Sequence, residues 1–245
     1  MDNILYPLTV YPCNKNSHPG LIKPFIICLA LYVLIPANAQ AIVEGGPNDY
    51  YDTSSWTHEY LRSVNSNHLV PAQNQVTNGY TGGKHYNIWG EIDFILRWFP
   101  NHPQGLQFMA RWLPEYPHPP DKNVEYYFRK AIEYKPSPKP RPMDATAPML
   151  YAIYLHKKKN YAKAQEQYES ALSITPNNSE IHYNLGLLLI ERNDYPAALK
   201  HAHIAYSMGF PLPGLKNKLK KLGAWKDIPE EQKSAHLQQE DQQKQ

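Results

Sequence analysis

Beyond residue 28 the sequence contains no cysteine. Its two cysteines, Cys13 and Cys28, both precede a predicted cleavage point after Ala39. A chain that begins at Gln40 therefore has no thiol for a disulfide, for thiolate catalysis or for cysteine-ligated zinc. Cys28 also lies within an apolar run instead of at the cleavage point, which argues against a lipoprotein.

The sequence has no marked excess of either charge. It contains 25 Lys and Arg and 22 Asp and Glu, for a net charge of +3. Residues 1–39 contribute two lysines and one aspartate, so their removal leaves a net charge of +2. Proteins that bind nucleic acid usually carry a clustered basic face. The balanced charge therefore predicts no nucleic-acid partner.

Long hydrophobic runs are also missing. The longest apolar stretch, residues 25–35, follows Lys15 and Lys23 and precedes Ala37-Asn38-Ala39. A basic region, a short apolar run and small residues at positions −3 and −1 form a secretory signal peptide. The run is shorter than the ~20 residues that span a bilayer. We predict that residues 1–39 are a signal peptide and that no stable membrane insertion remains after cleavage; an uncleaved anchor is the alternative.

The usual motifs of catalysis and metal binding are absent as well. The sequence contains no H-E-x-x-H, no phosphate-binding G-x-x-x-x-G-K-[ST] and no G-x-S-x-G. His201 and His203 are two apart on a predicted helix, which turns them about 200° from each other. His102 and His118 lie in proline-rich loops and are expected to be loop residues rather than ligands. We therefore predict no catalytic residue, no metal and no cofactor.

A helical periodicity begins at residue 88. Residues 40–87 are aromatic and rich in turn signals, with a helical period for no more than about two turns near Trp56–Val64, so an irregular N-terminal arm is expected there. Amphipathic patterns predict helices within 88–136, and the five prolines within 136–148 predict an extended linker over 137–144. A basic amphipathic helix is predicted over 213–226, and a solvated, disordered tail over 227–245.

An internal repeat occupies residues 145–212. When residues 145–178 are laid over 179–212, small residues coincide at three positions: Ala152 with Gly186, Ala164 with Ala198, and Ala171 with Ala205. Leu155 coincides with Leu189, and Pro176 falls one position from Pro211. Small residues allow two antiparallel helices to cross closely, and proline ends the second helix. The pattern predicts two consecutive helical hairpins.

This 34-residue pattern resembles the tetratricopeptide repeat. The resemblance implies an all-α, right-handed α-solenoid of helical hairpins, capped by the helix in 213–226. Residues 88–136 then hold degenerate copies, with residues 88–99 as the second half of one hairpin. The motifs at 46–50, 80–82, 93–103 and 206–215 recur in the same order in a family of exported proteobacterial tetratricopeptide proteins without an assigned activity. That resemblance implies a location in the bacterial periplasm.

The resemblance also implies a binding surface, because the first helix of each tetratricopeptide hairpin lines the concave face. The corresponding residues are Met149, Ile153, His156 and Lys157 in one repeat and Tyr183, Leu187, Ile190 and Glu191 in the next. They predict an apolar groove with a charged rim that suits an extended or helical peptide. Alternatively, the aromatic arm 40–87 folds back into this groove. Asn184 occupies a carboxylate-clamp position, but the apolar Met149 and Ile153 replace its basic partners, so that specificity is rejected.

Three functions remain open on the sequence. The favoured one is an exported scaffold or adaptor that binds a protein or peptide partner through the concave face. The second is an envelope protein that binds cell-wall glycan by stacking on Trp56, Tyr80, Trp89 and Trp98. The third is an enzyme whose site the motifs do not reveal.

Overall fold

The regular elements are all helical wherever the computed structural model describes the chain, which is over residues 47–52, 54–78, 88–113 and 122–227. The prediction of an all-α protein is confirmed for this part. The elements are α3 (Ser55–Val64), the π-helix η1 (Asn65–Leu69), α4 (Val70–Asn78), α5 (Ile88–Trp98), α6 (Pro103–Arg111), α7 (Val124–Glu133), the 3₁₀ turn η3 (Pro142–Ala145), α8 (Thr146–Lys157), α9 (Tyr161–Ile174), α10 (Ser179–Glu191), α11 (Tyr195–Ser207) and α12 (Gly214–Lys221). The predicted signal peptide, residues 79–87 and the tail from residue 228 lie outside the described residues.

The N-terminal arm is helical over most of its described length, so the prediction of an irregular arm is wrong there. Elements α3, η1 and α4 follow one another without a break from Ser55 to Asn78. Val64, Leu69 and Ala72 are buried, and η1 and α4 pack against α5. The π-helix comprises the five residues Asn65–Leu69. This step interrupts the helical period, which explains why the sequence pattern fades after residue 64.

Two sequence motifs, residues 46–50 and 93–103, meet in space. Asp49 accepts hydrogen bonds from Asn101 Nδ2 at 2.6 Å and from Arg141 Nη1 at 2.5 Å, and Asn101 Oδ1 accepts one from the backbone N–H of Tyr50 at 3.0 Å. Burial raises the pKa of Asp49, but the hydrogen bonds from Arg141 and Asn101 outweigh this effect and hold the pKa below its usual range. The motifs therefore fasten the start of the described chain to the α5–α6 turn and to the loop before α8.

His102 fixes the start of α6. Its Nδ1 accepts a hydrogen bond from the backbone N–H of Gly105 at 3.1 Å, so its Nε2 carries the proton and donates to Asn65 Oδ1 at 2.8 Å. The side chain is fully buried, and burial lowers its pKa to about 4. His102 is thus a neutral helix cap that ties α6 to η1, in agreement with its prediction as a loop residue.

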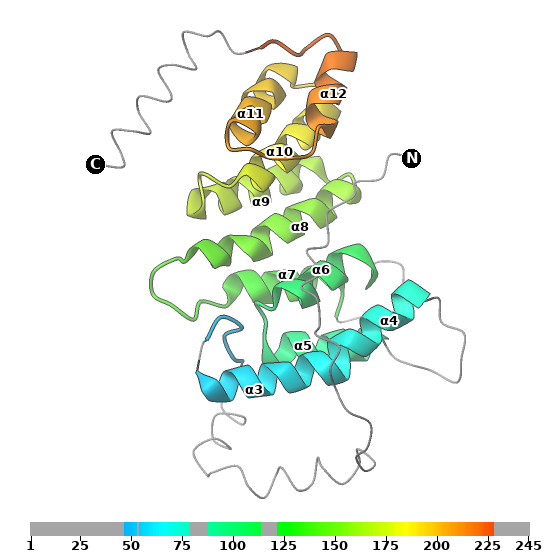
Figure 1. The fold of residues 1–245 in the computed structure, drawn as a ribbon, viewed down its shortest axis with the longest axis vertical. Helices are drawn as coiled ribbons and strands as arrows, with labels where there is room; N and C mark the ends of the chain where they lie inside the picture. The colour runs from blue at the N-terminus through cyan, green and yellow to red at the C-terminus, as the bar shows by residue number, and fades with distance from the viewer. Residues whose placement is uncertain (1–46, 53, 79–87, 114–121, 228–245) are drawn as a thin grey trace, which may run out of the picture. The chain divides into compact units, whose positions relative to one another are not determined.

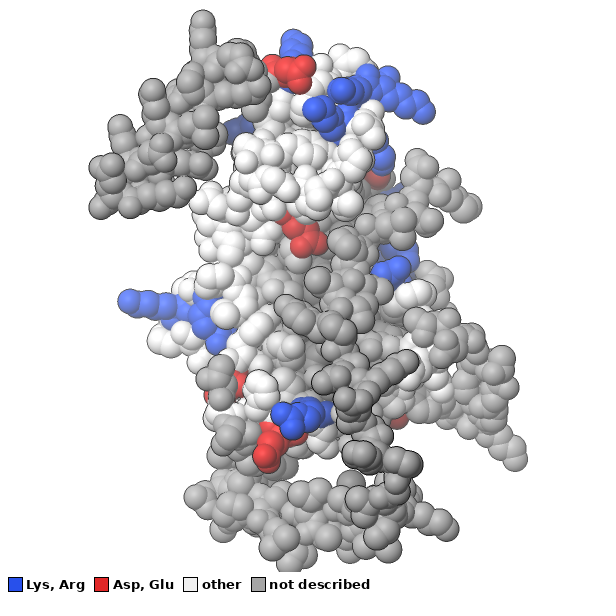
Figure 2. All heavy atoms as spheres, viewed as in Figure 1, with Lys and Arg blue, Asp and Glu red and all other residues white. Residues whose placement is uncertain are grey.

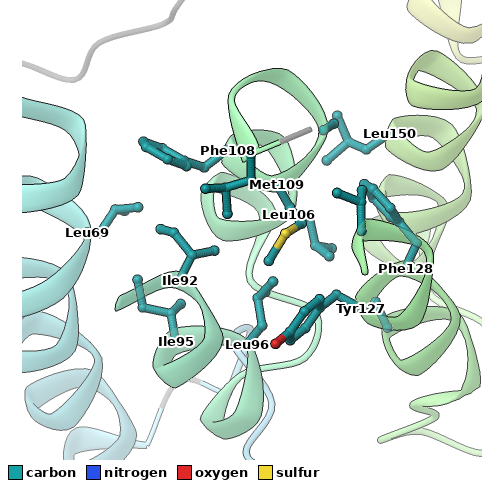
Figure 3. Packing of buried hydrophobic residues seen from close by; sticks show 14 of the residues in the cluster. Leu69, Ile92, Ile95, Leu96, Leu106, Phe108, Met109, Tyr127, Phe128 and Leu150 are labelled. Atoms are coloured by element: carbon teal, nitrogen blue, oxygen red, sulfur yellow. The ribbon is translucent and has the colours of Figure 1, made fainter. Parts of the chain in front are cut away.

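Helices α5, α6 and α7 form the first hydrophobic cluster (Figure 3). Ile92, Ile95 and Leu96 of α5 face Leu106 and Met109 of α6, and side chains from η1, α7 and α8 complete the packing. Ile92, Ile95, Leu106 and Met109 are fully buried. Helix α5 packs against η1 and α4 on one side and against α6 on the other. The sequence pattern predicts that α5 is the second helix of a hairpin, and in the structure the helical arm packs beside it.

The two predicted hairpins in residues 145–212 are present. Helix α8 packs against α9, and α10 packs against α11. The small residues of the repeat lie at these contacts, where Ala152, Ala164, Ala171, Ala198 and Ala205 are fully buried. A Cβ on Gly186 would come 2.6 Å from Leu215 Cδ2 and 3.5 Å from the carbonyl oxygen of Ala198. Gly186 therefore allows both α11 and α12 to approach α10 closely.

The turn inside each hairpin is the same. Lys159 and Asn193, which are 34 positions apart, have φ angles of 61° and 62°. The backbone N–H of Asn160 donates to Leu155 and that of Asp194 donates to Leu189, each at 2.9 Å. One left-handed residue with this hydrogen-bond pattern ends a helix abruptly. The repeat is therefore a repeat of backbone conformation as well as of side-chain size.

The helices form two layers. The first helices α6, α8, α10 and α12 pack in succession, and the second helices α7, α9 and α11 pack beside them. Helix α12 buries Leu215 and Leu219 against α10 and α11, at the place where the sequence predicts a terminal helix.

The proline-rich linker differs from the prediction at its end, because Pro142–Ala145 forms a 3₁₀ turn rather than an extended segment. A hydrogen bond from the backbone N–H of Arg141 to Asp144 starts that turn.

Candidate binding surface

The predicted surface residues lie on α8 and α10, which adjacent hairpins hold side by side. Asn178 caps α10, because its side-chain oxygen accepts from the backbone N–H groups of Glu180 and Ile181 at 3.0 and 3.1 Å. Helix α8 begins directly after the 3₁₀ turn. Both helices are mostly apolar around their circumference, and in α10 every residue from Ile181 to Leu189 is buried. Helix α10 is thus a central element of a second hydrophobic cluster, to which α8, α9, α11 and α12 also contribute.

The eight predicted residues fall into three classes of exposure. Lys157 and Glu191 are exposed, while Met149, Ile153 and Ile190 are half-buried. Tyr183, Leu187 and His156 are buried, with 6%, 6% and 7% of their surface exposed. The prediction of one open groove lined by all eight residues is therefore wrong for the three buried ones. The accessible part of the surface is apolar with a charged rim.

Tyr183 is buried by residues that follow the second hairpin. Its ring lies 4.5 Å from that of Phe210, and a Cβ on Gly214 would come 2.7 Å from its hydroxyl oxygen. The segment that leads into α12 thus covers the face of α10 that the repeat pattern assigns to the groove. The sequence alone did not show this, because Phe210 and Gly214 lie 27 and 31 positions after Tyr183.

At the C-terminal ends of α8 and α10 the structure brings two predicted residues together. His156 Nε2 lies within ion-pair distance of Glu191 Oε2, at 3.3 Å, and the hydroxyl of Tyr161 donates a hydrogen bond to Glu191. Burial lowers the pKa of His156, and the carboxylate of Glu191 partly offsets this effect. Lys218 of α12 lowers the same pKa further, so its charge lies close to this pair. The pair links the two first helices and leaves Lys157 free at the rim.

Residues 155–191 match the family model of a TPR repeat. The matched 37 residues run from the last turn of α8 through α9 to the end of α10. They include the left-handed turn at Lys159 and the crossings at Ala164 and Ala171. No curated protein matches the chain. The TPR match therefore covers the segment that joins the two predicted surface helices.

A histidine pair that the sequence reasoning missed joins α10 to α11. His182 of α10 and His201 of α11 are stacked, with 2.8 Å between their Nδ1 atoms. His182 Nε2 donates to the carbonyl oxygen of Pro176 at 2.8 Å, so His182 Nδ1 accepts the hydrogen bond that His201 Nδ1 donates. Sequence reasoning compared His201 with His203 on the same helix. The true partner lies across the hairpin, 19 positions away.

Glu180 is a second residue that sequence reasoning missed. It lies in the first turn of α10, and burial raises the pKa of its half-buried carboxyl. It is one helical turn before Tyr183, and its position in the repeat corresponds to that of Gly214. Helix α10 therefore carries a carboxyl group at its N-terminal end and the His156–Glu191 pair at its C-terminal end.

The aromatic residues of the glycan hypothesis are not an open stacking platform where the structure describes them. Trp89 has 4% of its surface exposed and packs edge-on against Tyr127. Trp98 is half-buried against Tyr60. Tyr80 and the side chain of Trp56 lie outside the described residues. The burial of Trp89 contradicts its assignment as a stacking residue.

Neither a metal site nor a membrane span is found in the parts of the chain that the structure describes. Within 47–52, 54–78, 88–113 and 122–227, no group of three or more His, Cys, Asp or Glu side chains could hold a metal ion. In the same ranges no helix has the length and apolarity needed to cross a bilayer. TPR repeats generally occur in scaffold proteins that have no catalytic activity of their own.

Proposed function

We propose that this chain is a TPR scaffold or adaptor that binds a segment of a protein partner across its first helices. The observation that carries the proposal is the TPR match over residues 155–191, which join the partly exposed surfaces of α8 and α10. TPR repeats generally mediate protein–protein interactions. The partner would contact Met149, Ile153 and Ile190 with its apolar side chains and Lys157 and Glu191 with its polar ones.

The exposure of these residues supports a peptide partner. Half-buried aliphatic side chains, with a charged residue at the C-terminal end of each helix, match an amphipathic helix or an extended segment with alternating side chains. Buried Leu187 shapes the floor of this surface, whereas Tyr183 is covered by Phe210 and does not contact the partner. In this proposal the helices stack as a right-handed solenoid, and the binding surface is its concave face.

The proposal also places the protein outside the cytoplasm. Residues 1–39 have the composition of a signal peptide, and the mature protein is expected to begin at Gln40 in the bacterial periplasm. The intact mass of the protein recovered from cells measures this directly. A mass that includes residues 1–39 would contradict export by cleavage and would leave the binding proposal untouched.

Peptide selection followed by two matched variants tests the binding proposal. A peptide library is selected against the full chain, and the affinity of a selected peptide is then measured for Lys157→Glu and Lys163→Glu. Both substitutions reverse one exposed charge, but Lys157 ends the first helix α8 and Lys163 lies on the second helix α9. We expect Lys157→Glu to change the affinity about tenfold or more and Lys163→Glu to leave it unchanged. Equal effects of the two variants would refute binding across the first helices.

A further inference from the structure

Helix α12 concentrates positive charge at one end of the described chain. Four of its eight residues are lysine, and none is acidic. Leu215 and Leu219 are buried against α10 and α11, whereas Lys220 and Lys221 are exposed. Figure 2 shows Lys and Arg side chains gathered at the end of the molecule where Figure 1 places α12. This helix therefore has one apolar face inside the protein and one cationic face outside it.

Apolar and aromatic side chains adjoin these lysines. Leu222 directly follows Lys221 and has 46% of its surface exposed. Half-buried Trp225 lies with its ring centroid 4.8 Å from Lys216 Nζ. Exposed Lys226 follows it. We call the set Lys216, Lys220, Lys221, Leu222, Trp225 and Lys226 the α12 patch.

The charge of the α12 patch is not explained by helix stability alone. Lysines near a helix C-terminus interact favourably with the helix dipole, which accounts for Lys220 and Lys221. Lys216 lies in the first turn, where the dipole disfavours a cation, and Lys226 lies beyond the helix end. Among residues 122–227 and the other described ranges, no ion pair neutralises a lysine of α12.

We propose that the α12 patch binds the surface of an anionic phospholipid bilayer. Several lysines with an exposed leucine and a tryptophan have the composition of peripheral membrane-binding helices, in which lysine contacts lipid phosphate and the apolar groups enter the interface. The exposed side of α12 can meet a planar surface, whereas a peptide ligand favours a groove such as that between α8 and α10. This inference is independent of the proposed peptide surface on those helices.

Vesicle sedimentation with the full chain tests the proposal. We expect binding to vesicles that contain phosphatidylglycerol, weak binding to pure phosphatidylcholine vesicles, and release as the salt concentration rises. Lys220→Gln/Lys221→Gln is expected to lower the partition coefficient on anionic vesicles by about 30-fold. The matched control is Lys135→Gln/Lys139→Gln, which removes two exposed lysines from the loop before α8. Since all variants carry the same N-terminal apolar run, differences among them report the patch.

A second pair of variants tests the apolar part of the patch. Leu222 and Val70 are both 46% exposed, but Val70 lies on α4. Leu222→Ser is expected to weaken vesicle binding severalfold, and Val70→Ser is expected to leave it unchanged. Thermal melts confirm that each variant is folded. Equal binding by the two lysine double variants would overturn the proposal. So would binding of the α12 patch to an immobilised acidic polypeptide without binding to anionic vesicles, because it would assign the patch to a protein partner.

Discussion

The His182–His201 pair is expected to make the stability of the second hairpin depend on pH. Burial, followed by the proximity of His182 and Lys200, lowers the pKa of His201 to about 4, and Glu169 opposes this effect. The hydrogen bond from His201 to Nδ1 of His182 requires that Nδ1 to be unprotonated, because Nε2 of His182 donates to Pro176. The fold therefore favours the neutral form of His201 over the cation.

The predicted consequence is a loss of stability in mild acid. In the unfolded chain His201 takes up a proton near pH 6.5, whereas in the fold it does so near pH 4. The unfolded state binds more protons between these two pH values. The contribution of neutral His201 to the free energy of unfolding is therefore fully present above about pH 6.5 and is lost as the pH falls toward 4. We expect the free energy of unfolding to fall by about 1 kcal/mol between pH 7 and pH 4.5, after allowance for the partial exposure of the ring.

Urea unfolding of two variants measures this contribution. His201→Gln should lose part of the difference in unfolding free energy between pH 7 and pH 4.5 that the parent shows. His203→Gln, on the same helix but outside the pair, should keep the parent difference. An unchanged difference in His201→Gln would show that the pair does not set the acid sensitivity.

Residue pairs of this kind are the part of the structure that the sequence does not disclose. Asp49 and Arg141 are 92 positions apart, and His156 and Glu191 are 35 apart. A repeat pattern predicts which helix faces meet, and it assigned His156 and Glu191 to the first helices of adjacent hairpins. It does not predict that they pair, because pairing depends on side-chain burial and rotamer. The burial of Tyr183 by Phe210 escaped the sequence for the same reason.

At the scale of elements, the hairpin turns carry a strained residue. Lys159 has a φ of 61°, where a side chain with a Cβ costs about 1–2 kcal/mol relative to the right-handed conformation. Glycine is the common residue at this position after a helix. Lys159→Gly is therefore expected to raise the free energy of unfolding by about 0.5–1 kcal/mol.

The neighbouring residue provides the control. Lys158 has a φ of −79° and is equally exposed, so Lys158→Gly gains no relief of strain. It should lower the free energy of unfolding, since glycine loses more backbone freedom on folding. Chemical denaturation of both variants gives the two values. Destabilisation by Lys159→Gly would contradict the left-handed turn.

The elements differ in how far the sequence reveals them. Helices α8 to α11 follow from the 34-residue offset, because small residues recur where the helices cross and because proline marks their ends. The helical arm was missed because Asn65, Ser66 and Asn67 give a polar stretch and because the π-turn shifts the apolar positions by one residue. The periodicity of apolar residues therefore predicted the regular hairpins, but it did not predict the arm, where an α-helix changes to a π-helix.

At the scale of the whole described unit, two hydrophobic clusters share a boundary on α8. Met149, Tyr151, Ile153 and Tyr154 pack against both clusters. Tyr151 stacks on Phe128 of α7 with ring centroids 5.1 Å apart. Because the boundary residues belong to both clusters, the described part is expected to unfold in one cooperative transition.

Tyr151→Ala is expected to weaken this coupling. The substitution removes the stacked ring and lowers the free energy of unfolding by about 2 kcal/mol. Because the two clusters then unfold separately, the slope of the unfolding free energy with denaturant concentration falls. Far-UV circular dichroism and tryptophan fluorescence then give different midpoints. Tyr195→Ala, at the start of α11, is the control and should keep coincident midpoints. Coincident midpoints in Tyr151→Ala would show that α8 does not couple the clusters through this residue.

The central claim is that the first helices of the TPR-type hairpins bind a polypeptide. The most direct measurement is photo-crosslinking in cells, with a photoreactive amino acid placed at Lys157 on α8 or at Lys163 on α9, followed by mass spectrometry of the crosslinked peptides. The account predicts that the probe at 157 crosslinks to a segment of a partner protein and that the probe at 163 does not. Crosslinking from 163 without crosslinking from 157 would contradict it.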